Sequence, residues 1–176
     1  KELDFWVAGI EFADSVGSDV VNSSLGYFTF DDSAMNFTYA DMNGEVSRAA
    51  KAASMAAQKG MIVVCSAGNE GDKTWKYIST PADAKGIITV GGVTADGTPS
   101  VFSSFGPSAD GRVKPEICAR GTQTSLINSS GNIVAGNGTS YSSPLICGLM
   151  ACYLQYFKEQ HKLISIPPLL QSVFVT

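Results

Sequence analysis

The chain has 176 residues, 44% of them hydrophobic, and a formal net charge of −4. This length and composition are typical of one compact globular domain and exclude a disordered chain. Because the chain is acidic and has no run of Lys or Arg, we expect it to bind neither nucleic acid nor an anionic membrane surface.

The first part of the chain alternates between helical and strand patterns. Apolar residues at helical spacing predict a helix over 3–16, which Gly17 can end in the left-handed conformation. A short strand is expected at 19–24. An alanine-rich helix follows over 45–59 and stops at Gly60.

The second part begins with two strands, 61–65 and 87–90, that are apolar on both faces. Such runs indicate a parallel sheet covered by helices on both sides, so the order of elements predicts α/β architecture. The runs 123–128 and 133–135 flank a Ser-Ser-Gly turn and predict a hairpin. The apolar stretch 145–154 is well short of the roughly 20 residues that span a bilayer, so we expect a buried helix and no membrane span.

A glycine-rich bend leads into that last helix. Pro144 is expected in its first turn, where little needs the missing N–H, and this places Ser140 at the helix N-terminus. Unpaired backbone N–H groups and the positive end of the helix dipole there favour developing negative charge, as a serine nucleophile requires. The same position suits a serine that only caps the helix, and this segment alone does not separate the two roles.

Four segments resemble motifs of the subtilisin-like serine peptidases, or subtilases, in the family's order. The segment 138–144, Gly-Thr-Ser-Tyr-Ser-Ser-Pro, resembles the signature around the nucleophile, and 66–71 resembles the segment whose asparagine donates to the oxyanion. The segment 19–26 resembles the strand ending in Ser-Leu-Gly that lines the substrate cleft, and 102–116 resembles the stretch between the asparagine and serine motifs. The segment 138–144 fits the α/β-hydrolases less well. Their nucleophile lies in a Gly-x-Ser-x-Gly turn, which requires glycine where this chain has Ser142.

This resemblance implies a three-layer α/β fold with a mainly parallel sheet, in which residues 1–176 form the C-terminal portion of one catalytic domain. It implies that Ser140 is the nucleophile and that the Asn69 side chain donates to the oxyanion together with the Ser140 amide. It also implies an extended polypeptide substrate between two segments, Ser24, Leu25 and Gly26 on one side and Ser66, Ala67 and Gly68 on the other. By the same resemblance the Thr80–Pro81 bond is expected to be cis.

The chain also departs from the family pattern. The segments that supply the family's aspartate and histidine are absent, and no histidine precedes Ser140. His161 would lie about six turns down the helix, roughly 30 Å from Ser140, so it cannot act as its base. We therefore expect this polypeptide alone to be inactive and to need an N-terminal half, in the same or a separate chain, that carries Asp and His. The alternative is a degenerate subtilase that binds peptides without cutting them.

The remaining expectations concern partners and compartment. An incomplete fold should expose an apolar face and self-associate.

The four cysteines lack C-x-x-C spacing, so we expect them to be small buried hydrophobic residues rather than ligands of a metal cluster. Their even number also permits disulfides. No cofactor is expected, and the sequence does not reveal whether calcium binds. The first residues do not resemble a secretory signal, so a secreted, periplasmic or surface location is implied by the family resemblance only. The four cysteines are Cys65, Cys118, Cys147 and Cys152.

Overall fold

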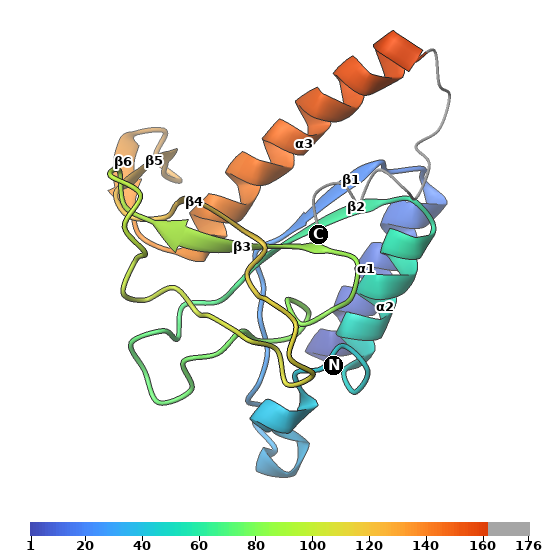
Figure 1. Ribbon diagram of the computed structural model, residues 1–176, viewed down its shortest axis with the longest axis vertical. Helices are drawn as coiled ribbons and strands as arrows, with labels where there is room; N and C mark the ends of the chain where they lie inside the picture. The colour runs from blue at the N-terminus through green and yellow to red at the C-terminus, as the bar shows by residue number, and fades with distance from the viewer. Residues whose placement is uncertain (162–176) are drawn as a thin grey trace.

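The computed structural model describes residues 1–161, which form three layers (Figure 1). A sheet of four parallel strands is the middle layer, in the order β1-β2-β3-β4. Helices α1 (Glu2–Ser15) and α2 (Arg48–Gln58) cover one face, and α3 (Thr139–His161) covers the other. The predicted three-layer α/β fold is confirmed.

All pairs of neighbouring strands run parallel, so the four carboxyl ends meet at one edge of the sheet. In the register of the first pair, Val20 lies opposite Ile62 and Ser23 opposite Cys65. β1 pairs only with β2, which leaves its other side as an edge of the sheet among the described residues. The strands are β1 (Val20–Ser23), β2 (Ile62–Ser66), β3 (Ile88–Val93) and β4 (Ile117–Arg120).

The apolar pattern of β2 explains the two cores. All five of its residues are buried, with Val63 facing α1 and α2 and Val64 facing α3. On the second face, α3 presents Ile146, Met150 and Leu154, which are spaced one turn apart and buried. The run predicted to be apolar on both sides is therefore the central strand between two helical layers.

Several boundaries differ from prediction. α2 begins at Arg48 rather than at residue 45, because the Ser47 hydroxyl accepts a hydrogen bond from the Ala49 amide and caps the helix there. β3 continues to Val93. β4 was not predicted, since its four residues are mostly exposed and give no apolar run. Two short 3₁₀ turns, Ser33–Met35 and Tyr39–Asp41, were also not predicted.

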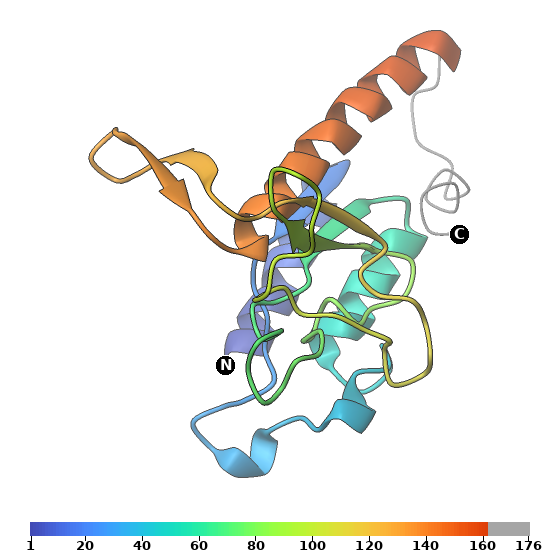
Figure 2. The same cartoon turned by 60° about the vertical axis from the view of Figure 1, so that its left-hand side comes forward.

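The predicted hairpin is present and projects away from the sheet (Figure 2). It consists of β5 (Thr124–Ile127) and β6 (Ile133–Gly136), which pair antiparallel. The chain passes from β6 directly into α3, so the hairpin lies immediately before Ser140 in sequence.

The four cysteines are free thiols. Cys65 is buried in β2, and burial raises the pKa of its thiol to about 12. Cys118 and Cys152 are exposed, so the expectation of buried small hydrophobes is wrong for these two, which lie on an outer strand and on the open side of α3. The Thr80–Pro81 bond is cis, as expected. Within residues 1–161 no helix has the length and apolarity that a membrane crossing requires.

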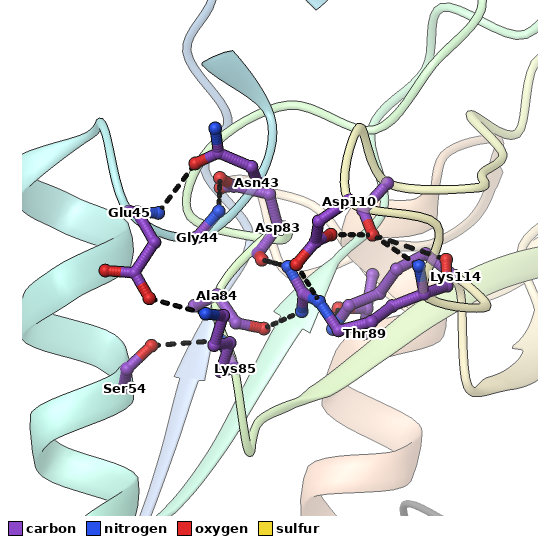
Figure 3. A network of polar contacts seen from close by, with 12 residues as sticks. Asn43, Gly44, Glu45, Ser54, Asp83, Ala84, Lys85, Thr89, Asp110 and Lys114 are labelled. Carbon is purple, nitrogen blue, oxygen red and sulfur yellow. Dashed lines mark hydrogen bonds and ion pairs between the residues drawn. The ribbon is translucent and has the colours of Figure 1, made fainter. Parts of the chain in front are cut away.

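Buried charges tie the loops around β3 to the sheet (Figure 3). The Lys114 side chain is 1% exposed, and its ammonium lies 2.6 Å from Glu116 Oε1 and donates to Thr89 Oγ1 at 2.9 Å. Asp83 is fully buried beside this cluster. Its Oδ2 accepts from the Gly44 amide at 2.8 Å, whereas Oδ1 has no partner. Burial raises the pKa of the Asp83 carboxyl, and its few hydrogen bonds do not offset this.

Asp83→Asn is expected to stabilise the fold at neutral pH. Because the folded pKa is raised, the penalty for ionising Asp83 is absent below its ordinary value of 3.8 and grows as pH rises through the raised pKa. The amide keeps an acceptor for Gly44 and can donate to Thr80 Oγ1, which also lacks a partner. Urea unfolding should give a gain of about 1 kcal/mol at pH 7 that disappears near pH 3. A loss of stability at pH 7 would mean that Lys114 stabilises the carboxylate more than burial destabilises it.

Candidate active site

Ser140 is the second residue of α3, as the helix N-terminus prediction required. The helix starts at Thr139, so Pro144 is its sixth residue and lies inside the helix, not in its first turn as predicted. The earlier start has a physical cause. The Asn69 side chain caps the helix, with its Oδ1 accepting from the Thr139 amide at 2.8 Å, and this satisfies one of the N–H groups that a helix start leaves unpaired.

This cap also determines the orientation of the Asn69 carboxamide. The Thr139 amide can only donate, so the atom that it contacts must be the carbonyl oxygen of Asn69. The Thr139 hydroxyl lies 3.0 Å from the same oxygen. The Nδ2 group must then point away from Thr139, and within the described residues it donates to nothing.

Thr139 joins three groups at the start of the helix, a role that sequence reasoning missed. It is fully buried, and its Oγ1 accepts from the Gly68 amide at 3.2 Å. The same hydroxyl lies within bonding distance of the Gly68 carbonyl and of Asn69 Oδ1. The signal that could have found this role is the place of Thr139 between Gly138 and Ser140 in the motif that resembles the family signature.

The Ser140 side chain has no base beside it. Neither its hydroxyl nor its backbone N–H bonds to another group in residues 1–161, and the residue is half-buried. The chain has one histidine, His161, at the far end of α3, roughly 30 Å away along the helix. The side chain of His161 lies outside the described residues. In the same part of the chain, no three His, Cys, Asp or Glu side chains are grouped to hold a metal ion.

The candidate site lies where the carboxyl ends of the four strands meet the start of α3. Ser24, just after β1, donates to the Ser140 carbonyl at 3.0 Å, and Asn69 follows β2. Gly121, just after β4, donates to the last residue of β3 at 2.8 Å and accepts from Gly138 at 2.8 Å. In open parallel sheets this edge is where ligands bind.

The two predicted substrate segments lie side by side, because β1 and β2 are neighbours, but they differ in free hydrogen-bonding groups. No main-chain N–H or C=O of residues 24–26 bonds to another main-chain group among residues 1–161, and Leu25 is 53% exposed. The Gly68 amide and carbonyl are already bonded to Thr139 and Ser104. The other two residues of that segment, Ser66 and Ala67, are buried.

Two glycines of these segments have no room for a side chain. A Cβ on Gly26 would collide with Ser79 Oγ, and one on Gly68 would lie 2.8 Å from Ser104 Oγ. Gly68 also has a φ of +112°, which side chains rarely adopt. The glycines therefore allow the close approach of the loop that holds Ser79, a residue that sequence reasoning did not single out.

Ser142 carries a buried hydroxyl without a hydrogen bond. The residue is fully buried, its Oγ has no partner, and it faces Gly121 so closely that a Cβ there would collide with it. A buried unpaired hydroxyl costs about 1–3 kcal/mol. The Ser142 hydroxyl is thus a local source of instability two residues after Ser140.

The chain is similar to known proteins over most of its length. A model described as the subtilase family matches residues 4–168. Subtilisin DY of Bacillus licheniformis is 31% identical over 153 residues, which are 86% of this chain and 48% of that protein. The membrane-bound transcription factor site-1 protease of Mus musculus is 30% identical over 136 residues, or 74% of this chain and 12% of that protein. The chain spans less than half the length of these relatives.

Solved structures have the same fold. The patellamide maturation protease PatA superposes with a TM-score of 0.74 at 25% identity, covering 98% of this chain and 56% of that one. A cold-adapted subtilisin-like serine proteinase gives a TM-score of 0.65 at 24% identity, covering 94% of this chain and 50% of that one. In both cases this chain corresponds to about half of the larger structure.

Replacing Ser142 by alanine should raise the free energy of unfolding by about 1 kcal/mol, because it removes a buried hydroxyl that has no hydrogen-bond partner. Ser143→Ala is the matched control. Ser143 is equally buried in the same turn, but its hydroxyl donates to Asn22 Oδ1 at 2.6 Å, so its loss should destabilise the fold. Chemical denaturation of the two variants should give shifts of opposite sign, and equal losses would contradict this account.

Proposed function

Because the chain belongs to the subtilase family, we propose that it is the part of a serine endopeptidase that carries the nucleophile. In this proposal Ser140 Oγ attacks the carbonyl carbon of a peptide bond. The resulting oxyanion accepts hydrogen bonds from the Ser140 amide and from Asn69 Nδ2. These two donors belong to different elements, α3 and the loop after β2, and are preset before substrate arrives.

The observation that carries the proposal is the bond between Asn69 and the start of α3. Its oxygen end caps the helix at 2.8 Å, which leaves its nitrogen end without a partner among the described residues. An asparagine that served only as a cap would need no donor, since serine or aspartate accepts equally well at this position. The free N–H groups of Ser140 and Asn69 match what an acyl-transfer oxyanion needs.

The chemistry needs a base that this chain lacks. A serine hydroxyl becomes an effective nucleophile when a histidine takes its proton, and the same histidine then protonates the leaving amine as the acyl-enzyme forms. Water attacks the acyl-enzyme in the second half of the reaction and regenerates Ser140. No step requires a cofactor.

We place the missing half at the open side of β1. A groove of about 620 Å³ lies there, lined by residues of α1, β1 and the segment that follows β1. Phe5 and Leu25, 72% and 53% exposed, are among the lining residues and make it apolar. A strand beside β1 would cover these side chains and bring a histidine and an aspartate to the edge where Ser140 lies. Without that half, the same surface is our proposed site of self-association.

The substrate in this proposal is an extended polypeptide along residues 24–26, whose main-chain groups are free to pair with it. Secretion, or a periplasmic or surface location, remains part of the proposal through family membership alone. A noncatalytic peptide-binding module is the second candidate, favoured by the lack of any histidine before Ser140. The residues encoded before Lys1 discriminate between the two. A family-type aspartate motif and histidine motif there would support the enzyme.

The isolated chain should neither cleave peptides nor react measurably with a fluorophosphonate probe, because Ser140 Oγ has no base. The complete parent protein should be labelled on Ser140. The Ser140→Ala variant is the negative control for the isolated chain and for the parent protein. Mass spectrometry of the labelled peptide measures this. Rapid labelling of Ser140 in the isolated chain would contradict the claim that the base lies outside this chain.

Two substitutions of Asn69 separate its roles. Asn69→Asp keeps an acceptor for the Thr139 amide but loses the donor, whereas Asn69→Ala loses both. In the parent enzyme both should lower turnover by about 10²- to 10³-fold, the magnitude known for such a donor in subtilisin itself. In the chain alone, only Asn69→Ala should lose stability, by about 1 kcal/mol. Full turnover in Asn69→Asp would show that the nitrogen has no part in the reaction.

A further inference from the structure

The carbonyl of Ser140 lacks the partner that a helix normally provides. In an α-helix the carbonyl of one residue accepts from the N–H four residues later, which for Ser140 is Pro144, and proline has no N–H. The Ser24 hydroxyl, just after β1, donates to this carbonyl instead, at 3.0 Å. The peptide unit of the nucleophile is therefore held from the sheet.

Ser24 is itself held by a second residue, Asn22. Asn22 Nδ2 donates to Ser24 Oγ at 3.1 Å, and Asn22 Oδ1 accepts from the Ser143 hydroxyl at 2.6 Å. The direction of every bond is determined. The Ser140 carbonyl can only accept, so the Ser24 hydroxyl must donate its single proton to it. The Ser24 oxygen can then only accept a hydrogen bond from Asn22. This orients the carboxamide and leaves its oxygen for Ser143.

Asn22 is an exposed residue of the edge strand β1. Along β1, Val20 packs into the core beneath α3 and Val21 into the core beneath α1, so Asn22 shares the α3 side with Val20. Both ends of the Asn22 carboxamide are used by groups linked to the first turns of α3. Its polarity has a specific use at this position.

We propose that Asn22 and Ser24 are positioning residues for the nucleophile, acting through one directed chain of hydrogen bonds from Ser143 to the Ser140 carbonyl. The chain holds the first turns of α3 against β1, while Asn69 holds the helix start against the loop after β2. Ser24 then acts on the enzyme's own backbone through its side chain, and only its main chain is left for a substrate. This inference rests on the proposed role of Ser140.

The kinetic test uses the complete parent enzyme and a synthetic peptide substrate. Ser24→Ala should lower kcat by about 10- to 100-fold with KM nearly unchanged, because misplacing a reacting group by about 1 Å costs on that order. Ser24→Thr retains a hydroxyl and should restore most of the rate. The double variant with Asn22→Ala should lose little more than Ser24→Ala, since both act through one bond. A raised KM with unchanged kcat, or no change in either, would overturn the proposal.

A spectroscopic test on the isolated chain separates this inference from the peptidase function. With ¹³C at the Ser140 carbonyl, Ser24→Ala should shift that resonance upfield as the hydrogen bond is lost, and Ser24→Thr should not. Asn22→Asp, which still accepts from Ser143 but cannot donate to Ser24, gives a second variant if Ser24→Ala fails to fold. An unmoved resonance in the folded variants refutes the hydrogen-bond chain even in an active enzyme. A moved resonance in an inactive parent supports it and refutes only the proposed function.

Discussion

The first turn of α3 is held at the carboxyl edge of a parallel sheet, and the rest of the site depends on that attachment. A helix start leaves several N–H groups unpaired, and here Asn69 satisfies the first of them from the loop after β2. Thr139 adds contacts with Gly68 from inside the same junction. Because the loops after β1 and β4 also bond to this junction, Ser140 lies where α3 meets the carboxyl edge of the sheet.

Each group at this junction uses one end for stability and leaves its other end available for the proposed chemistry. Asn69 stabilises the helix with its oxygen and keeps its nitrogen free, while Ser140 gives its carbonyl to Ser24 and keeps its amide free. Unpaired donors at a helix N-terminus are unfavourable in an empty site and favourable once an oxyanion occupies it. The unpaired hydroxyl of Ser142 has no such use and only weakens the fold.

Patterns local in sequence predicted most of the fold. The burial of β2 on both faces and the amphipathic run of α1 specify their elements without reference to the rest of the chain. β4 could not be predicted, because it is defined by its pairing with β3 and not by an apolar run. The misplaced start of α3 has the same origin, since its cap, Asn69, is 70 residues away in sequence. The motif resemblance nevertheless located Ser140 and Asn69, which the structure brings together. The chain of bonds through Asn22 could not be foreseen, because it links residues up to 121 positions apart.

The central claim is that two donors from separate elements converge on one oxygen. A crystal structure of the complete parent protein with a peptidyl boronic acid on Ser140 tests this most directly. The account predicts one boronate oxygen within hydrogen-bonding distance of both the Ser140 amide and Asn69 Nδ2, with the Thr139 to Asn69 bond intact. A boronate oxygen directed away from Asn69, or an Asn69 carboxamide turned with its oxygen toward the inhibitor, would contradict it.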